Sequence, residues 1–248
     1  QLRNSIRFLL NDRIVDLDKV VAADTLLDFL RLQQRLCGSK EGCAEGDCGA
    51  CTVLVGRLAE GDLKYETVNS CIRFVGSLDA CHVVTIEHLR GVDGALHPVQ
   101  QAMVDMHGSQ CGFCTPGIVM SLYALWMANA TPNNADIETS LQGNLCRCTG
   151  YEAIIRAAGA AASAGGQAQD VLISERDKVV ATLQGLADGS RVAMGQGDDR
   201  FLVPASVEDL AEIRVENPTS VIVAGATDVG LWVTKHMRPI APAIFISH

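Results

Sequence analysis

The spacing of the cysteines constrains this sequence more than any other feature. Ten cysteines occur in 248 residues, and eight of them form two groups. The first group has the pattern C-x4-C-x2-C followed by a more distant fourth cysteine, and the second combines C-x2-C with C-x-C. The members are Cys43, Cys48, Cys51 and Cys71 in the first group, and Cys111, Cys114, Cys146 and Cys148 in the second. Cys37 and Cys81 belong to neither group and are predicted to be buried free thiols.

The charge and hydrophobicity of the chain predict a compartment in which its cysteines are not expected to form disulfides. The net charge is −9, so a basic surface for nucleic acid or for an anionic membrane is not expected. The sequence shows no run of eighteen apolar residues and no secretory signal, so we expect a cytoplasmic protein without a membrane span. Disulfides are rare in the reducing cytoplasm, which leaves buried structural thiols, zinc ligation or iron–sulfur ligation, and the spacing decides among these.

The first group has the spacing of a plant-type [2Fe–2S] site. Four thiolates that converge on a small anionic cluster require the backbone to wrap it closely. Gly42, Gly46 and Gly49 allow such tight turns and let backbone N–H groups approach the sulfurs. A zinc site would more often use two CxxC pairs, so the pattern favours a [2Fe–2S] cluster over zinc.

The second group lies between predicted helices. A threonine directly follows Cys114 and another follows Cys148, and Thr115 and Thr149 are the predicted N-caps of two of these helices. Helix N-termini stabilise thiolates and anionic groups. Spacing alone leaves zinc open here, but the neighbouring plant-type pattern favours a second [2Fe–2S] cluster. Four helices are predicted to begin near His97, Thr115, Asn133 and Thr149 and to form a small bundle.

Hydrophobic periodicity predicts an α+β multidomain fold. A hairpin over residues 6–17, a helix capped by Asp24 or Thr25, and strands over 52–55 and 81–86 make a small sheet with one helix on it. The predicted domains are a sheet domain over 1–87, a helical domain over 88–163, a linker over 164–170 and a mixed domain over 171–248.

The last predicted domain contains an apolar strand over 220–224 that runs into a glycine turn. Its final residues, 243–248, resemble a buried strand more than a chain end, so we expect this domain to be incomplete.

Longer motifs around the cysteines resemble the molybdenum hydroxylases, the family of xanthine dehydrogenase and aldehyde oxidase. The motifs span 41–53, 110–117 and 143–151, and the resemblance covers about residues 1–165. It implies a ferredoxin-like β-grasp domain whose [2Fe–2S] cluster lies nearer a flavin, and a helical domain whose [2Fe–2S] cluster lies nearer a molybdopterin. The eight grouped cysteines would be the ligands, and Gln110 would contact the pterin in a partner subunit.

Residues 222–230 resemble the flavin pyrophosphate loop of the same family, which implies the start of an α/β FAD-binding domain. A strand that ends in such a turn offers N–H groups and a hydroxyl to phosphate oxygens. The implied FAD contacts are Ile222, Val223, Ala224, Gly225, Ala226, Thr227, Asp228 and Val229. The combination of both clusters and a flavin segment in one chain most resembles the small subunit of bacterial xanthine dehydrogenases. That likeness implies a large molybdopterin-binding partner and a heterotetramer of two small and two large subunits.

The function implied by this resemblance is electron transfer within a xanthine dehydrogenase. Electrons from purine hydroxylation, which converts hypoxanthine and xanthine to urate, would pass through both clusters to FAD and then to NAD⁺. No residue of this chain is given a catalytic role toward the substrate. Two alternatives stay open: a subunit of a molybdenum hydroxylase that oxidises aldehydes or N-heterocycles, and a zinc-bearing interaction module.

Overall fold

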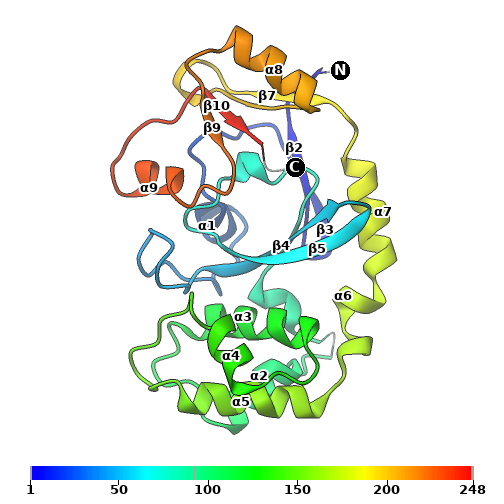
Figure 1. Ribbon diagram of the computed structural model, residues 1–248, viewed down its shortest axis with the longest axis vertical. Helices are drawn as coiled ribbons and strands as arrows, with labels where there is room; N and C mark the ends of the chain where they lie inside the picture. Colours follow the sequence, from blue (N-terminus) through cyan, green and yellow to red (C-terminus); the bar gives the residue numbers. More distant parts are fainter. Residues whose placement is uncertain (1, 92, 247–248) are drawn as a thin grey trace.

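The structure is a computed structural model that describes residues 2–91 and 93–246, and it contains two five-stranded sheets and a helical bundle (Figure 1). The bundle lies at one end of the long axis and the C-terminal sheet at the other, with the N-terminal sheet between them. The mixed α+β architecture predicted from the sequence is confirmed. No helix among the described residues combines the length and the apolarity that a membrane crossing needs.

The N-terminal sheet has the strand order β3-β2-β6-β4-β5, in which only the β2–β6 pair is parallel. Its strands are β2 (Ile6–Leu10), β3 (Arg13–Leu17), β4 (Thr52–Ala59), β5 (Asp62–Asn69) and β6 (His82–Val84). Shorter elements of this part are α1 (Leu26–Asp28), η1 (Phe29–Gln33), η2 (Val75–Ser77) and η3 (Ile86–Leu89). The predicted hairpin is present, because β2 pairs antiparallel with β3. The predicted Thr25 cap is also present, because the Thr25 side chain accepts a hydrogen bond from Asp28 N.

The helical bundle consists of four helices, as predicted. They are α2 (Pro98–Asp105), α3 (Thr115–Ala128), α4 (Asn134–Ser140) and α5 (Glu152–Ala164). Two predicted caps are wrong. The N-cap of α3 is Cys114, one residue earlier than predicted. The N-cap of α5 is Tyr151, because Gly150 and Tyr151 both adopt positive φ (66° and 69°) and delay the helix beyond Thr149.

The C-terminal sheet has the strand order β1-β7-β8-β10-β9. Its strands are β1 (Leu2–Arg3), β7 (Arg191–Met194), β8 (Phe201–Val203), β9 (Val221–Val223) and β10 (Ala243–Phe245). The other elements are η4 (Gln167–Gln169), α6 (Val171–Ser174), α7 (Arg176–Leu186), η5 (Gly197–Asp199), α8 (Val207–Glu216) and α9 (Val229–Thr234). The strand predicted near residue 220 is β9, which is an edge strand. The strand predicted over 243–248 is β10, and residues 247–248 lie outside the described residues.

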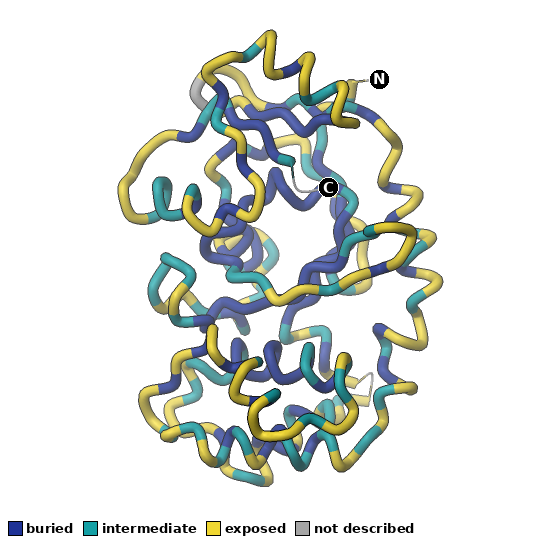
Figure 2. The backbone as a smooth tube through the Cα atoms, viewed as in Figure 1, coloured by how far each residue is buried: buried dark blue, intermediate teal, exposed yellow. Residues whose placement is uncertain are grey.

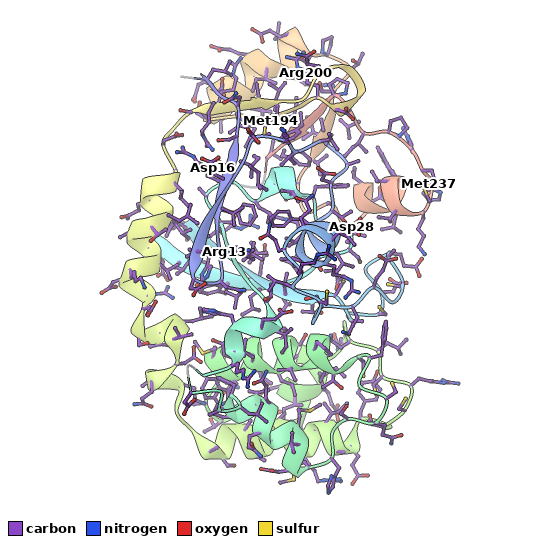
Figure 3. The ribbon with its side chains drawn as sticks, turned by 180° about the vertical axis from the view of Figure 1, so that it is seen from behind. Arg13, Asp16, Asp28, Met194, Arg200 and Met237 are labelled. Atoms are coloured by element: carbon purple, nitrogen blue, oxygen red, sulfur yellow. The ribbon has the colours of Figure 1, made fainter. Side chains whose placement is uncertain are left out.

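The two sheets share one hydrophobic core although they are far apart in sequence. β1 pairs in parallel with β7, so the N-terminus completes the C-terminal sheet. The ring centroid of Phe74, in the N-terminal part, lies 5.9 Å from the ring centroid of Phe245 in β10, and both rings are fully buried. Figure 2 shows this dark, buried centre between the sheets. In the opposite view, Met237 lies on the outer loop after α9, where it is exposed (Figure 3).

Candidate metal centres

The first thiol group lies on a loop that leads into β4. Cys51 and Cys71 are buried, with exposed fractions of 1% and 3%, while Cys43 and Cys48 are half-buried. The Cys43 sulfur accepts hydrogen bonds from the backbone N–H groups of Cys48 (3.4 Å) and Glu45 (3.5 Å). Gly49 has φ +67°, a backbone conformation that strains other residues. Glycine adopts it without strain because it has no Cβ, so the loop can turn here. The loop thus directs N–H groups at a sulfur, as a site for an anionic cluster requires.

Within this group the thiols interact in two pairs. The Cys71 thiol donates a hydrogen bond to Cys51, which lowers the pKa of Cys51 to about 7 and raises the pKa of Cys71. Cys43 pairs with Cys48. Burial by itself would raise the pKa of Cys43, but the N–H groups of Cys48 and Glu45 outweigh it, and the pKa is lowered. One thiol of each pair is therefore favoured as a thiolate, the form that binds metal.

The second thiol group also forms two pairs, at the ends of the bundle helices. Cys111 and Cys148 are exposed, and their sulfurs lie 3.6 Å apart. Cys114 and Cys146 interact deeper in the protein. Burial, followed by the hydrogen bond to Cys146, raises the pKa of Cys114 to about 12. The pKa of Cys146 is lowered, because hydrogen bonds from the side chain and backbone of Thr149 outweigh burial.

The paired arrangement suits a two-iron cluster better than a single ion. No three thiol, imidazole or carboxylate side chains among residues 2–91 and 93–246 are close enough to enclose one metal ion. In a [2Fe–2S] cluster with four cysteine ligands, the thiolates are divided between two irons. Two thiol pairs per site match that division, whereas a tetrahedral zinc site draws four ligands to one centre.

Cys37 and Cys81 lie outside both groups, as the spacing indicated. Cys81 is buried as predicted, with 2% of its surface exposed, and burial raises its pKa to about 11. The prediction that Cys37 is buried is wrong. Cys37 lies in the loop that follows η1 and is exposed there.

The loops of the two sites touch each other directly. Leu145 N donates a hydrogen bond to the Cys48 carbonyl oxygen (2.9 Å), and the Asn144 side-chain amide donates to Gly49 O (3.1 Å). A Cβ placed on Gly117 of α3 would lie 2.0 Å from Gly49 O. The sequence alone indicates no role for Asn144. Its contact with Gly49 spans 95 residues, and no local pattern encodes it.

The segment with flavin-loop resemblance lies beside the first site. Ala224, Gly225, Thr227 and Asp228 are exposed in the turn between β9 and α9. The start of α9 packs so closely on the residue after Cys71 that a Cβ on Gly230 would lie 2.6 Å from Ile72 Cβ. Leu231 packs against the group of buried side chains that includes Cys51 and Cys71. Gln110, in contrast, is exposed next to Cys111 of the second site.

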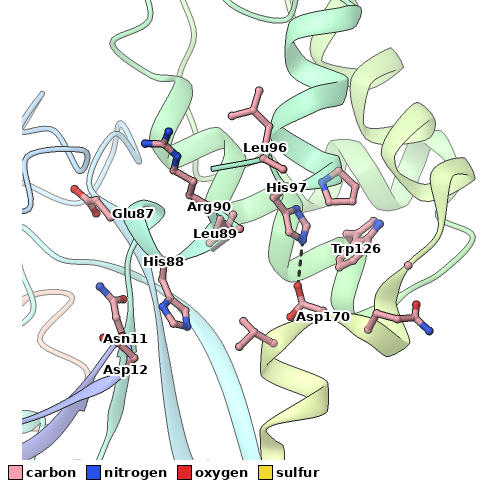
Figure 4. A pocket seen from close by; sticks show the side chains of 16 residues that line it. Asn11, Asp12, Glu87, His88, Leu89, Arg90, Leu96, His97, Trp126 and Asp170 are labelled. Atoms are coloured by element: carbon pink, nitrogen blue, oxygen red, sulfur yellow. Dashed lines mark hydrogen bonds and ion pairs between the residues drawn. The ribbon is translucent and has the colours of Figure 1, made fainter. Parts of the chain in front are cut away.

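A cavity of about 730 Å³ is lined by no thiol and is separate from both sites. It lies where the connector between α5 and α6, residues 165–170, meets α2 and α3. His97 and Asp170 meet there at 3.1 Å, with Trp126 beside them (Figure 4).

Comparison with known proteins matches these sites to two domain families. Residues 10–75 match the 2Fe-2S iron-sulfur cluster binding domain, and residues 85–159 match the [2Fe-2S] binding domain. A chain of quinoline 2-oxidoreductase from Pseudomonas putida 86 is 32% identical with a TM-score of 0.56, and the match covers 64% of this chain and 94% of that one. The chain belongs to the molybdenum hydroxylase family. It therefore carries iron–sulfur domains of an oxidoreductase.

Two further members of this family are similar over a larger share of the chain. Xanthine dehydrogenase of Drosophila subobscura is 35% identical in an alignment of 250 positions, which covers 86% of this chain and 19% of that protein. Aldehyde oxidoreductase from Desulfovibrio desulfuricans ATCC 27774 is 33% identical with a TM-score of 0.57, over 73% of this chain and 18% of that one. The chain thus spans about a fifth of the length of the curated relatives it matches.

Proposed function

We propose that this molybdenum hydroxylase chain is the electron-transfer subunit of a xanthine dehydrogenase. It would carry electrons from a molybdopterin centre in a partner subunit to FAD and then to NAD⁺. The observation that carries the proposal is the division of eight thiols into two sites of two pairs each. The proposed ligands are Cys43, Cys48, Cys51 and Cys71 for the first [2Fe–2S] cluster and Cys111, Cys114, Cys146 and Cys148 for the second.

Each site has residues suited to a bound cluster. A [2Fe–2S] cluster, when bound, supplies one-electron chemistry. The N–H groups of Glu45 and Cys48 stabilise sulfur charge at the first site, and Thr149 does so at the second. Burial of Cys51 and Cys71 limits water near the first site, whereas Cys111 and Cys148 leave the second open to a partner.

The order of the sites along the molecule supports a direction for the electrons. The proposed FAD contacts, residues 222–229, precede the part of α9 that packs beside Cys71. Gln110 and the second-site thiols Cys111 and Cys148 are exposed, and we propose that they face the large molybdopterin-binding subunit, with Gln110 in contact with the pterin. The second site would accept electrons from the partner, and the first would deliver them to FAD. We propose the assembly to be a heterotetramer of two such chains and two large subunits.

The choice of a purine substrate rests on the likeness to xanthine dehydrogenases. The similar aldehyde and quinoline oxidoreductases keep aldehyde and N-heterocycle oxidation as the second candidate. Purification of the holoenzyme with its partner, followed by assays with xanthine, an aldehyde and quinoline, tests this choice. NAD⁺ reduction driven by xanthine supports the proposal, and turnover of only an aldehyde or quinoline contradicts the purine assignment.

Metal analysis and EPR spectroscopy test the clusters themselves. We expect about four iron and four labile sulfide per chain, and two distinct EPR signals after reduction. Cys148→Ser should remove one signal and leave that of the first site, because the first site uses none of the bundle cysteines. Two zinc ions without sulfide would contradict the proposal. A single spin per chain would show that one site holds no cluster.

A further inference from the structure

We propose that Asn144 is a positioning residue that fastens the two thiol loops together and so sets the electronic coupling between the two sites. The inference rests on the proposed function, because it requires both sites to hold clusters. The bond at stake runs from Leu145 N to Cys48 O (2.9 Å). Leu145 directly precedes Cys146, so this one hydrogen bond joins a proposed ligand of the first site to the neighbour of a proposed ligand of the second.

The Asn144 side chain connects three separate elements. Its amide nitrogen donates to Gly49 O (3.1 Å) in the first loop and to Thr52 Oγ1 (3.3 Å) at the start of β4. Its amide oxygen accepts a hydrogen bond from Ser121 Oγ of α3 (2.6 Å). The residue is 5% exposed, so both polar ends of the amide are buried and satisfied. A fully satisfied buried network of this kind fixes one geometry.

The backbones at this junction leave no room for an alternative packing. A Cβ on Gly49 would lie 2.1 Å from Gly143 O, and one on Gly117 would lie 2.0 Å from Gly49 O. The two loops and the first turn of α3 therefore meet backbone to backbone. The two loops and α3 are already at contact distance and cannot move closer together. If the hydrogen bonds of Asn144 are weakened, the loops can therefore only move apart.

The far side of the Leu145 loop is open. A groove of about 380 Å³ lies beside it, between Asp47 of the first loop and Tyr151 and Ile155 of the second domain. The Leu145 side chain is 60% exposed, so it does not anchor the loop. Tyr151 Oη fixes the segment internally, since it donates to Asn144 O (2.9 Å) and accepts from Cys146 N (2.6 Å). Asn144 is then the side chain that ties this internally fixed segment to the first site.

The test compares magnetic interaction between the two reduced clusters in the wild type and in Asn144→Asp. The aspartate keeps the size of the side chain and an acceptor for Ser121, but it places an oxygen against Gly49 O instead of an N–H group. EPR spectra of the fully reduced chain should show splitting of the two signals in the wild type and loss of that splitting in Asn144→Asp. The g values and the spin count of each separate signal should stay unchanged.

Two further variants complete the experiment. Ser121→Ala removes one of the bonds to Asn144 without touching either loop, and it should narrow the splitting; it decides the question if Asn144→Asp does not fold. Asn129→Ala is the matched control, because the Asn129 side chain donates to Asp136 Oδ2 and accepts from Thr131 N, both within the bundle, and it should leave the splitting unchanged.

The outcomes separate this inference from the proposed function. Absence of both [2Fe–2S] signals in the wild type overturns the proposed function. Two signals whose splitting is absent from the wild type, or is unchanged in folded Asn144→Asp and Ser121→Ala, overturn the positioning role alone.

Discussion

The Asp170 carboxylate accepts three hydrogen bonds, from residues in three different parts of the chain. The donors are Nε2 of His97 (3.1 Å), which precedes α2, Oη of Tyr123 (2.6 Å) in α3, and the backbone N of Leu172 (2.9 Å) in α6. His97 Nδ1 accepts from Val99 N, so the ring proton is on Nε2 and points at the carboxylate. Burial alone would raise the pKa of Asp170, but the bonds from His97 and Tyr123 outweigh it, and the pKa is lowered.

This carboxylate should stabilise the attachment of the connector to the bundle. Asp170→Ala leaves His97 and Tyr123 without their acceptor, so the free energy of unfolding should fall by about 3 kcal/mol in urea titrations. Asp105→Ala, at an exposed site in α2, should change it by less than about 0.5 kcal/mol. Equal midpoints for the two variants would contradict the role of Asp170.

The pH dependence of this contribution follows from the lowered pKa. The ionised carboxylate stabilises the folded state fully above the unfolded-state value of about 3.9. The stabilisation is lost as the pH falls through the still lower folded-state pKa. The difference in stability between wild type and Asp170→Ala should therefore shrink only below about pH 4.

Among the elements, α9 packs directly beside the first site. Gly230→Ala would place a methyl group 2.6 Å from Ile72 Cβ and 2.8 Å from Ile72 O, directly after Cys71. We expect it to cost about 1–3 kcal/mol of stability by overpacking and to shift the EPR signal of the first site. The second signal should not change.

Gly159→Ala in α5 is the matched control for this helix glycine. A Cβ there meets nothing within 4 Å, so the substitution should stabilise the chain by about 0.5–1 kcal/mol through helix propensity. If both alanine variants were equally stable, α9 would not be packed on the first site as the structure shows.

Strong local patterns made most elements predictable, and their absence explains the errors. β5 was not predicted, because it is an edge strand and only Leu63 of its eight residues is buried, which leaves little alternation to detect. Thr149 has the residue type of a cap, but it bonds to Tyr151 N and to the Cys146 sulfur one turn before the helix. The cysteine spacing indicated which thiols belong together. It could not indicate that Asn144 joins the two loops.

The arrangement of the whole molecule depends on contacts between the two ends of the chain. β1 is the first strand, and it pairs with β7 almost two hundred residues later. Arg3 donates two hydrogen bonds to Asp79 (2.8 and 2.6 Å), which tie β1 to the N-terminal sheet as well. The same short segment thus joins both sheets, and the shared core lies between them. Local sequence patterns predict neither contact, since each depends on packing across the full length.

Because the sheets share a core, we expect them to unfold as one cooperative unit. Phe245 of β10 is fully buried, with its ring centroid 5.3 Å from that of Phe201 and 5.9 Å from that of Phe74. Phe245→Ala should lower the free energy of unfolding by about 3–5 kcal/mol. It should also broaden the EPR signal of the first site, because Phe74 lies three residues after Cys71, and leave the second signal intact.

Met237→Ala is the control for this change. Because Met237 is 81% exposed, its substitution should change the free energy of unfolding by less than about 0.5 kcal/mol. Urea unfolding followed by far-UV circular dichroism and by the first-site absorbance should give coincident transitions in the wild type. Separate transitions for the two probes, or a Phe245→Ala midpoint as high as that of Met237→Ala, would show that the C-terminal sheet is stable apart from the first site. Coincident transitions that shift together in Phe245→Ala would mean that the proposed flavin segment and the first thiol site keep their relative positions through the core they share.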